Sequence, residues 1–227
     1  VFGEYFIYGS RAGELVWQAY DIGHPYRAYK VGRSIKLDPV LAGDTVVTAA
    51  TSGQIMAIEA ENISTRWQYE LPGQIRAKPA VGPTAVYVAS DDQYLRAFDL
   101  FSGRLVWRAL TEAPLTTSPT AVGRRVFQFI PGTGLACYEA MPRGRYDGNR
   151  QWLNTEVAGE VLTVRNDRVL VWNPATKELV QLSTATGVVE QRRKLSRVDR
   201  LISDELENGR LYSLDDRGRL DCLVPLD

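Results

Sequence analysis

Short apolar runs alternate with polar turn residues along the chain. The runs at 46–50, 85–89 and 126–130 are rich in β-branched and aromatic residues, which favour extended strands. Each is followed by a turn and a second apolar run, at 55–60, 94–100 and 135–140. No stretch shows the 3.6-residue spacing of an amphipathic helix. The pattern therefore predicts an all-β protein.

These runs recur with a period of about forty residues. Prolines follow one another at this constant interval, at Pro39, Pro79 and Pro119. Tryptophans keep the same interval from Trp67 to Trp107, and the step to Trp152 is longer because of an insertion at 141–146. Four short strands in each such unit are typical of a β-propeller blade, a small sheet that buries its faces against its neighbours.

We therefore predict an all-β fold, a β-propeller of four-stranded antiparallel blades in a single domain, 1–227. The expected blades are 1–33 (partial), 34–73, 74–113, 114–153, 154–192 and 193–227 (partial). This gives five or six blades, in a closed ring or in part of a larger one. Pairing of the first strands with the last unit would close the ring, whereas truncation before Val1 would leave an open edge.

One large ring in each unit is expected to wedge between neighbouring blades, where its apolar surface is buried. The predicted blade-docking residues are Trp17, Trp67, Trp107, Trp152, Gly103 and Asp99. In this alignment 12–17 copies 102–107, and Gln191 stands where the fifth unit would carry its tryptophan. The step from Trp17 to Trp67 is longer than one period, which then implies an insertion near 24–33.

The segment 97–107 reads A-x-D-x-x-S-G-x-x-x-W. It resembles the tryptophan-docking motif of the PQQ-like (quinoprotein-like) propeller repeats, which carry threonine at the serine position. Within that family the chain is similar to the non-catalytic, BamB-like branch. The PQQ-dependent enzymes of the family hold their cofactor beneath two adjacent cysteines, and this sequence has no such pair. The resemblance therefore implies a scaffold without a cofactor.

The charges balance, with 27 basic and 27 acidic residues and a formal net charge of zero. This gives no electrostatic reason to expect nucleic acid or an anionic membrane as a partner. No apolar run approaches the length of about eighteen residues that a membrane helix needs, so no transmembrane segment is expected. The resemblance implies an extracytoplasmic location, in the periplasm or cell envelope. It is compatible with peripheral membrane association through an anchor that precedes Val1.

Residues that carry catalysis or bind metals are scarce. His24 is the single histidine, and we expect it in a solvated loop. Cys137 and Cys222 align with Ala97, a small position on the third strand, so we expect two free thiols at small buried sites two blades apart. We predict no catalytic, cofactor-binding or metal-binding residue and no enzyme activity.

Three features are candidate binding surfaces. Insertions in repeats map to loops that often form a binding face, and tyrosine and arginine are frequent at interface hot spots. The predicted interaction loops contain Tyr26, Arg27, Tyr29, Arg143, Arg145 and Tyr146. A basic run covers 191–194 and continues to Arg197 and Arg200. Polar residues at the start of the innermost strands are candidates to line a central channel: Lys36, Asp38, Arg76 and Lys78.

The leading hypothesis is a non-catalytic scaffold that binds another protein of unknown identity. By the resemblance, its setting would be protein assembly in the cell envelope. Two alternatives stay open. One is a PQQ-dependent quinoprotein dehydrogenase or its remnant, which uptake of PQQ with turnover would support. The other is a sensor domain that binds a small ligand in the central channel.

Overall fold

The computed structural model describes residues 1–21, 23–142, 144 and 146–223. In this part of the chain it contains 22 strands and no helix. The strands form six antiparallel sheets, and each sheet is built from strands that are consecutive in sequence. The all-β prediction is therefore confirmed, with the sheets as the predicted propeller blades.

The sheets at the two ends have three strands each, and the other four sheets have four. The first sheet contains β1 (Tyr5–Gly9), β2 (Glu14–Ala19) and β3 (Pro25–Lys30). The second contains β4 (Val40–Ala42), β5 (Thr45–Ala49), β6 (Gln54–Glu59) and β7 (Ser64–Glu70). The third contains β8 (Ala80–Val81), β9 (Ala85–Ala89), β10 (Tyr94–Asp99) and β11 (Leu105–Leu110).

The fourth sheet contains β12 (Thr120–Val122), β13 (Arg125–Ile130), β14 (Gly134–Glu139) and β15 (Arg150–Asn154). The fifth contains β16 (Glu160–Arg165), β17 (Arg168–Asn173), β18 (Glu178–Ser183) and β19 (Val189–Lys194). The sixth contains β20 (Val198–Ser203), β21 (Leu211–Asp215) and β22 (Leu220–Leu223). The fifth sheet extends beyond the predicted boundary at residue 192, because β19 continues to Lys194.

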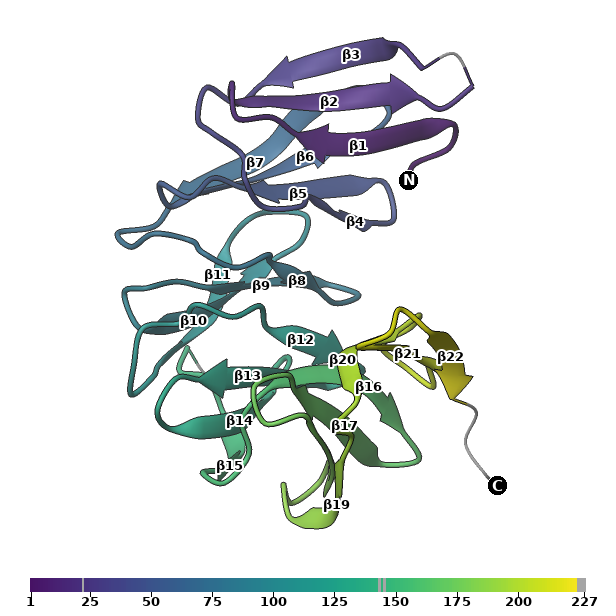
Figure 1. Ribbon diagram of the computed structural model, residues 1–227. Coiled ribbons are helices and arrows are strands. Elements are labelled where there is room, and N and C mark those ends of the chain that lie inside the picture. The colour runs from purple at the N-terminus through teal and green to yellow at the C-terminus, as the bar shows by residue number, and fades with distance from the viewer. Residues whose placement is uncertain (22, 143, 145, 224–227) are drawn as a thin grey trace.

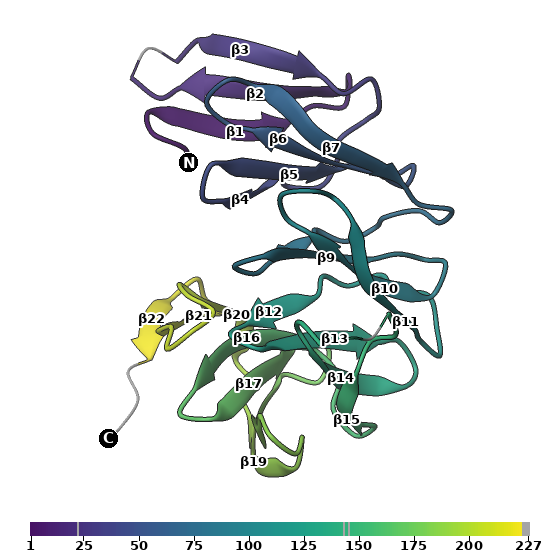
Figure 2. The same ribbon diagram turned by 180° about the vertical axis from the view of Figure 1, so that it is seen from behind.

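The six sheets follow one another around an arc (Figure 1). The first strands of neighbouring sheets contact each other: β4 contacts β8, β8 contacts β12, and β16 contacts β20. The fourth strands, such as β11 and β15, lie on the outside of the arc, as the view from behind also shows (Figure 2). The first and sixth sheets form its two ends.

The three strands of the first sheet and the three strands of the sixth correspond to different strands of a complete four-stranded sheet. In the first sheet Ile7 pairs with Trp17, as Val47 pairs with Ala57 in the second. Strands β1, β2 and β3 therefore correspond to the second, third and fourth strands of a complete sheet. The turn between β21 and β22 corresponds to the one between β9 and β10, so the sixth sheet has the first three strands.

The expected pairing of the first strands with the last unit is wrong for the described residues. Strands β1–β3 and β20–β22 form separate sheets with no ladder between them. The two partial sheets therefore do not complete each other, and the described part of the chain forms an open arc.

The core consists of separate apolar clusters between successive sheets. In the middle of the arc a sheet is covered on both faces, so every residue of β5 and β9 is buried. Strands at the ends have fewer neighbours, and most of β3 and β22 is exposed.

The two cysteines reflect this difference between the middle and the ends. Both are free thiols, as expected. Cys137 is buried in β14, and its burial raises the thiol pKa to about 12. The expectation of a buried site is wrong for Cys222, which is exposed on β22 in the last sheet.

Candidate functional site: the junctions between sheets

Three tryptophans join consecutive sheets in the same way. Trp67 on β7 donates its indole N–H to the Leu100 carbonyl of the next sheet, at 2.8 Å. Trp107 donates to the Ala140 carbonyl at 2.8 Å, and Trp152 donates to the Thr184 carbonyl at 2.9 Å. All three rings are buried. Each therefore fills the space between two sheets and satisfies a backbone acceptor of the following one.

A glycine in the following sheet makes room for each ring. A Cβ on Gly103 would lie 2.5 Å from the Trp67 ring, and one on Gly187 would lie 2.5 Å from the Trp152 ring. Gly103 also has a positive φ of 68°, which a residue with a side chain adopts at a cost. These positions therefore require glycine for both space and backbone conformation.

Asp99 shapes the turn that carries Gly103. Its carboxylate accepts hydrogen bonds from the Ser102 hydroxyl at 2.7 Å and the Ser102 backbone N–H at 2.8 Å. The bond from the Ser102 hydroxyl is the main reason why the pKa of Asp99 lies below its usual value. Asp99 thus acts on the junction indirectly, by fixing the turn against which the Trp67 ring packs.

The predicted role of Trp17 as a fourth member of this series is wrong. Trp17 lies on β2, a third strand, and pairs with Arg27 on β3, as Ala57 pairs with Trp67. Arg27 therefore occupies the tryptophan position, one repeat period before Trp67. Trp17 is still buried between the first two sheets, but its indole N–H has no hydrogen-bond partner among the described residues.

This register also removes the predicted insertion near 24–33. The regular period continues through Arg27, and Pro25–Lys30 is the fourth strand β3. The glycine position of the second sheet has changed as well: Ile63 stands one repeat period before Gly103 and has a positive φ of 53°. Its side chain packs against the cluster that contains Trp17. The first junction thus replaces the tryptophan–glycine pair with a different apolar packing.

The predicted interaction residues have different environments. Tyr26 and Arg27 are exposed on β3, and the Tyr26 ring stacks on Tyr5 at 4.8 Å between centroids. Tyr29 instead contacts the second sheet, through a hydrogen bond between its hydroxyl and that of Thr65. Tyr146 is 82% exposed. Arg143 and Arg145 lie outside the described residues.

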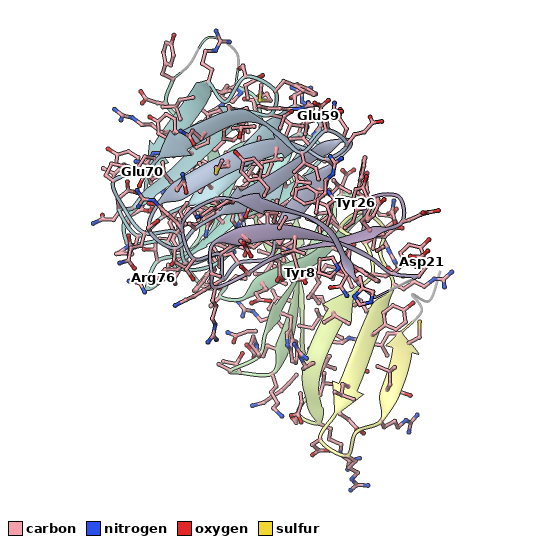
Figure 3. The ribbon with its side chains drawn as sticks, turned by 90° about the horizontal axis from the view of Figure 1, so that it is seen from above. Tyr8, Asp21, Tyr26, Glu59, Glu70 and Arg76 are labelled. Atoms are coloured by element: carbon pink, nitrogen blue, oxygen red, sulfur yellow. The ribbon has the colours of Figure 1, made fainter. Side chains whose placement is uncertain are left out.

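The first sheet carries an aromatic surface that the sequence reasoning did not identify. Phe6, Tyr8, Tyr20 and Tyr26 are 51%, 41%, 55% and 53% exposed. The rings of Phe6 and Tyr20 meet edge to face, at 5.9 Å. In the view from above, Tyr8 and Tyr26 lie on the first sheet, and Glu70 and Arg76 lie at the opposite end of the strands from Tyr26 (Figure 3). The signal that could have revealed this surface is the aromatic-rich strand 5–8.

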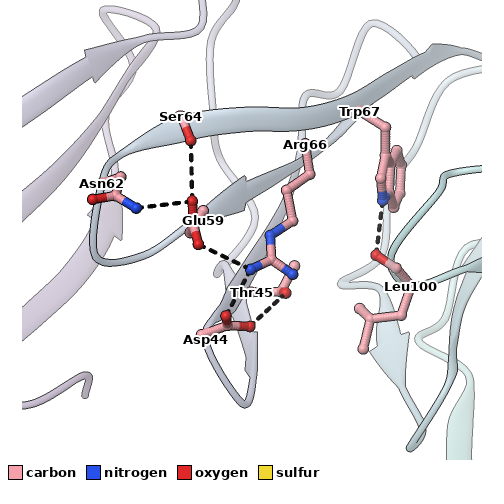
Figure 4. A network of polar contacts seen from close by, with 8 residues as sticks. All are labelled: Asp44, Thr45, Glu59, Asn62, Ser64, Arg66, Trp67 and Leu100. Atoms are coloured by element: carbon pink, nitrogen blue, oxygen red, sulfur yellow. Dashed lines mark hydrogen bonds and ion pairs between the residues drawn. The ribbon is translucent and has the colours of Figure 1, made fainter.

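A polar network ties the turn between β4 and β5 to the strands β6 and β7 of the second sheet (Figure 4). Arg66 binds the Asp44 carboxylate at 2.6 Å and the Glu59 carboxylate at 3.3 Å. Glu59 also accepts a hydrogen bond from the Asn62 amide at 3.1 Å. The Arg66 hydrogen bond lowers the pKa of Asp44, and the Asn62 hydrogen bond lowers that of Glu59. These paired groups stabilise the turns and leave neither carboxylate as a proton acceptor near neutral pH.

A second network lies in the turn between β9 and β10. Arg96 and Asp92 form two hydrogen bonds, at 2.6 and 2.9 Å, and the Arg96 side chain is only 7% exposed. Ser90 donates to the same carboxylate. Burial raises the pKa of Asp92, but the hydrogen bonds from Arg96 and Ser90 outweigh it, and the net shift is downward. This is a satisfied structural ion pair.

Of the four predicted channel residues, Lys78 alone lines the cavity near the innermost strands. That cavity has a volume of about 370 Å³ and is bounded by residues of β8, β12 and β16. Lys36 and Asp38 are both exposed, and Arg76 forms a 3.2 Å ion pair with Asp91. The predicted cluster of four polar side chains around one channel is therefore not assembled.

A cleft between the fifth and sixth sheets has a volume of about 460 Å³. Its wall from the fifth sheet includes Gln191 and Arg193, two residues of the basic run. In the sequence, Gln191 stands where the repeat would carry a tryptophan. The structure shows that a cleft is present at this position.

The described residues contain no group of three or more histidine, cysteine, aspartate or glutamate side chains that could hold a metal. In the same part of the chain, no helix has the length and apolar character to cross a membrane. His24 is exposed.

Comparison with known proteins places these features in a family. Residues 7–145 match the family model described as outer membrane protein assembly factor BamB. The assembly factor BamB of Nitrosomonas eutropha is 25% identical over 160 residues, which is 60% of this chain and 38% of that protein. BamB of Shewanella oneidensis is 25% identical over 137 residues, 59% of this chain and 31% of that protein. The chain thus matches well under half of each relative's length.

A protein of another kind shares the repeat. The serine/threonine-protein kinase AfsK of Streptomyces griseus is 30% identical over 135 residues, 57% of this chain and 16% of that protein. Among solved structures, BamB from Moraxella catarrhalis superposes with a TM-score of 0.75 at 21% identity, over 98% of this chain and 67% of that one. The computationally designed protein Ika8 gives a TM-score of 0.77 at 13% identity. These likenesses establish the fold.

Proposed function

Since the chain belongs to the family of the outer membrane protein assembly factor BamB, we propose that it is a non-catalytic β-propeller scaffold in outer membrane protein assembly. The observation that carries the proposal is the family match over 7–145. It is supported by the junctions, because the residues of the repeat motif are engaged in holding sheets together. In this role the chain acts by presenting surfaces to a partner protein, in an extracytoplasmic setting.

The aromatic surface of the first sheet is the proposed contact region for that partner. Phe6, Tyr8, Tyr20 and Tyr26 expose large rings on one end of the arc, and such rings contribute much of the binding energy in interfaces. Arg27 adds a cation beside the Tyr26 ring, at 5.2 Å from its centroid. We include the predicted interaction residues Tyr26 and Arg27 in this proposed contact region.

The cellular role is tested by deleting the gene in its native host and measuring folded outer membrane proteins. We expect lower amounts of heat-modifiable barrel proteins, restored by the wild-type gene. Unchanged barrel proteins in the deletion strain would contradict the proposal. Incubation with PQQ and Ca²⁺, followed by an absorbance scan and a dye-linked alcohol assay, tests the enzyme alternative, and turnover there would also contradict it.

The contact region is tested by photo-cross-linking in the same host. A photoreactive amino acid at position 26 is expected to yield a cross-link to a protein of the assembly machinery, and Tyr20→Ala is expected to weaken it. Phe101→Ala is the matched control, because it removes an equally exposed ring, 56% accessible, from the third sheet. The absence of any cross-link from position 26 would contradict the first sheet as the contact region, and equal cross-linking in Tyr20→Ala and wild type would remove Tyr20 from it.

A further inference from the structure

The junction between the fifth and sixth sheets differs from the three junctions that tryptophans fill. In the fifth sheet Gln181 pairs with Gln191 immediately before the strand irregularity, as Ala97 pairs with Trp107 in the third. Gln191 therefore occupies the docking position. A glutamine is smaller than an indole and is exposed here. The space that a ring fills elsewhere is part of a cleft of about 460 Å³.

Part of the lining of this cleft is apolar. Leu170 and Leu179 line the cleft from the fifth sheet, and Leu211 and Leu223 line it from the sixth. All four are at least partly accessible to solvent. Leucines that line a cleft of this size provide a site that favours a flat apolar ring over water.

Another part of the lining is basic. Arg165, Arg168 and Arg193 line the cleft. Arg168 is neutralised by Glu190 at 2.7 Å, and Arg165 donates to the Gly209 carbonyl at 2.7 Å. Arg193 has no carboxylate partner among the described residues. Its guanidinium donates to the Gln191 amide oxygen, at 3.1 and 3.2 Å, when that amide is oriented to accept. The guanidinium groups of Arg165 and Arg193 thus keep their positive charges in the cleft.

The sixth sheet also offers a backbone edge beside the cleft. Strand β22 has β21 as its one strand partner in the described part of the chain. An extended segment can add to such an edge through main-chain hydrogen bonds, with alternate side chains directed into neighbouring pockets. This feature favours a peptide segment over a small free carboxylate.

We propose that this cleft binds an extended acidic peptide segment that carries an aromatic side chain. The ring takes the apolar space left by the absent tryptophan, and adjacent carboxylates pair with Arg193 and Arg165. The inference rests on the proposed function in taking the ligand from a partner protein. The expected chemistry of the ligand depends only on the residues that line the cleft.

Binding is measured by isothermal titration of the purified chain with the peptide acetyl-Asp-Trp-Asp-Val-Glu-amide. Two matched peptides replace the tryptophan with alanine, or the acidic residues with their amides. We expect saturable binding of the first peptide that weakens as salt rises, because the charges are exposed. The matched peptides are expected to bind more weakly. Equal heats for all three peptides, or no binding at millimolar concentration, would overturn the proposal.

Two variants and one control locate the site. Gln191→Trp introduces the ring found at the other junctions, so it should abolish peptide binding while the chain stays folded, as checked by thermal unfolding. Arg193→Gln should weaken binding about two- to fivefold, as expected for an exposed ion pair. Arg192→Gln is the control, because Arg192 is on the same strand and contacts Glu156 at 3.5 Å instead of lining the cleft. Unchanged binding in Gln191→Trp would place the peptide elsewhere.

The two proposals fail separately. Peptide binding that Gln191→Trp blocks, together with normal outer membrane proteins in the deletion strain, would leave the cleft as a peptide site and refute the assembly role. Lower barrel proteins in the deletion strain, restored equally by wild type and Gln191→Trp, would support the assembly role without this cleft.

Discussion

At the residue scale, similar tryptophans play different parts. Trp67, Trp107 and Trp152 each donate a hydrogen bond across a junction. Trp17 is as deeply buried, but its N–H has no partner in the described part of the chain. The contribution of an indole therefore depends on whether its polar edge meets a backbone acceptor.

Comparison of Trp67→Phe with Trp17→Phe tests this difference. Both changes shrink a buried ring, but only Trp67→Phe leaves the Leu100 carbonyl without its indole donor. We expect Trp67→Phe to lower the free energy of unfolding by about 1–2 kcal/mol more than Trp17→Phe does. Urea unfolding followed by circular dichroism measures both values. An equal loss in the two variants would show that the hydrogen bond adds nothing to the junction.

At the scale of the element, the turn between β9 and β10 depends on an ionised carboxylate. Because the folded pKa of Asp92 lies below its usual value of 3.8, its ionised form stabilises the fold above that pH. The stabilisation is lost as pH falls through the folded pKa. Asp92→Asn also leaves the buried Arg96 guanidinium without its negatively charged partner.

We therefore expect Asp92→Asn to lower the free energy of unfolding at pH 7 by about 1–3 kcal/mol. The variant should also depend less on pH than the wild type below about pH 4. Denaturant unfolding between pH 7 and pH 2.5 provides the measurement. Asp216→Asn, which removes an exposed carboxylate, should follow the wild type. If Asp92→Asn kept the full pH dependence of the wild-type unfolding free energy, Asp92 would not be the source of that dependence.

The repeat predicted the elements well because each sheet obeys the same spacing. Prolines and tryptophans at a constant interval indicated the sheets between positions 34 and 153. The prediction failed at the first sheet, where Arg27 replaces the expected tryptophan and Trp17 on the adjacent strand gave a false alignment. A single-residue marker cannot distinguish neighbouring strands when both carry an aromatic residue.

The candidate sites were harder to predict than the sheets. Gln191 was recognisable as an absent tryptophan, but the cleft beside it also requires the leucines of two different sheets. The aromatic surface of the first sheet likewise combines Phe6 on β1 with Tyr20 after β2. Such sites depend on contacts between strands, which a linear pattern of residue types does not specify.

At the scale of the whole molecule, the open arc implies unequal stability along the chain. Among the described residues, the third and fourth sheets have apolar clusters on both faces, whereas the first and sixth sheets each pack against one other sheet. In stacked repeats, stability is close to a sum of terms for each repeat and for each interface. The end sheets therefore have the smallest interface contribution.

Hydrogen–deuterium exchange with mass spectrometry can detect this gradient. We expect amides in β9, β10, β13 and β14 to exchange slowest, and those in β1–β3 and β20–β22 to exchange fastest, because end sheets open locally at lower cost. Gln191→Trp should slow exchange in β20–β22 by strengthening the last junction and should leave β1–β3 unchanged. Uniform exchange along the chain would mean that the arc unfolds as one cooperative unit.

The tryptophan junction has a direction, since each indole reaches from one sheet to a carbonyl and a glycine of the sheet that follows. The third and fourth sheets therefore each receive a ring on one side and supply one on the other. After duplication or loss of a whole repeat, a tryptophan of one sheet would again face a carbonyl and a glycine of the next sheet. The tryptophan junction is therefore compatible with an arc that grows or shrinks by one sheet at a time.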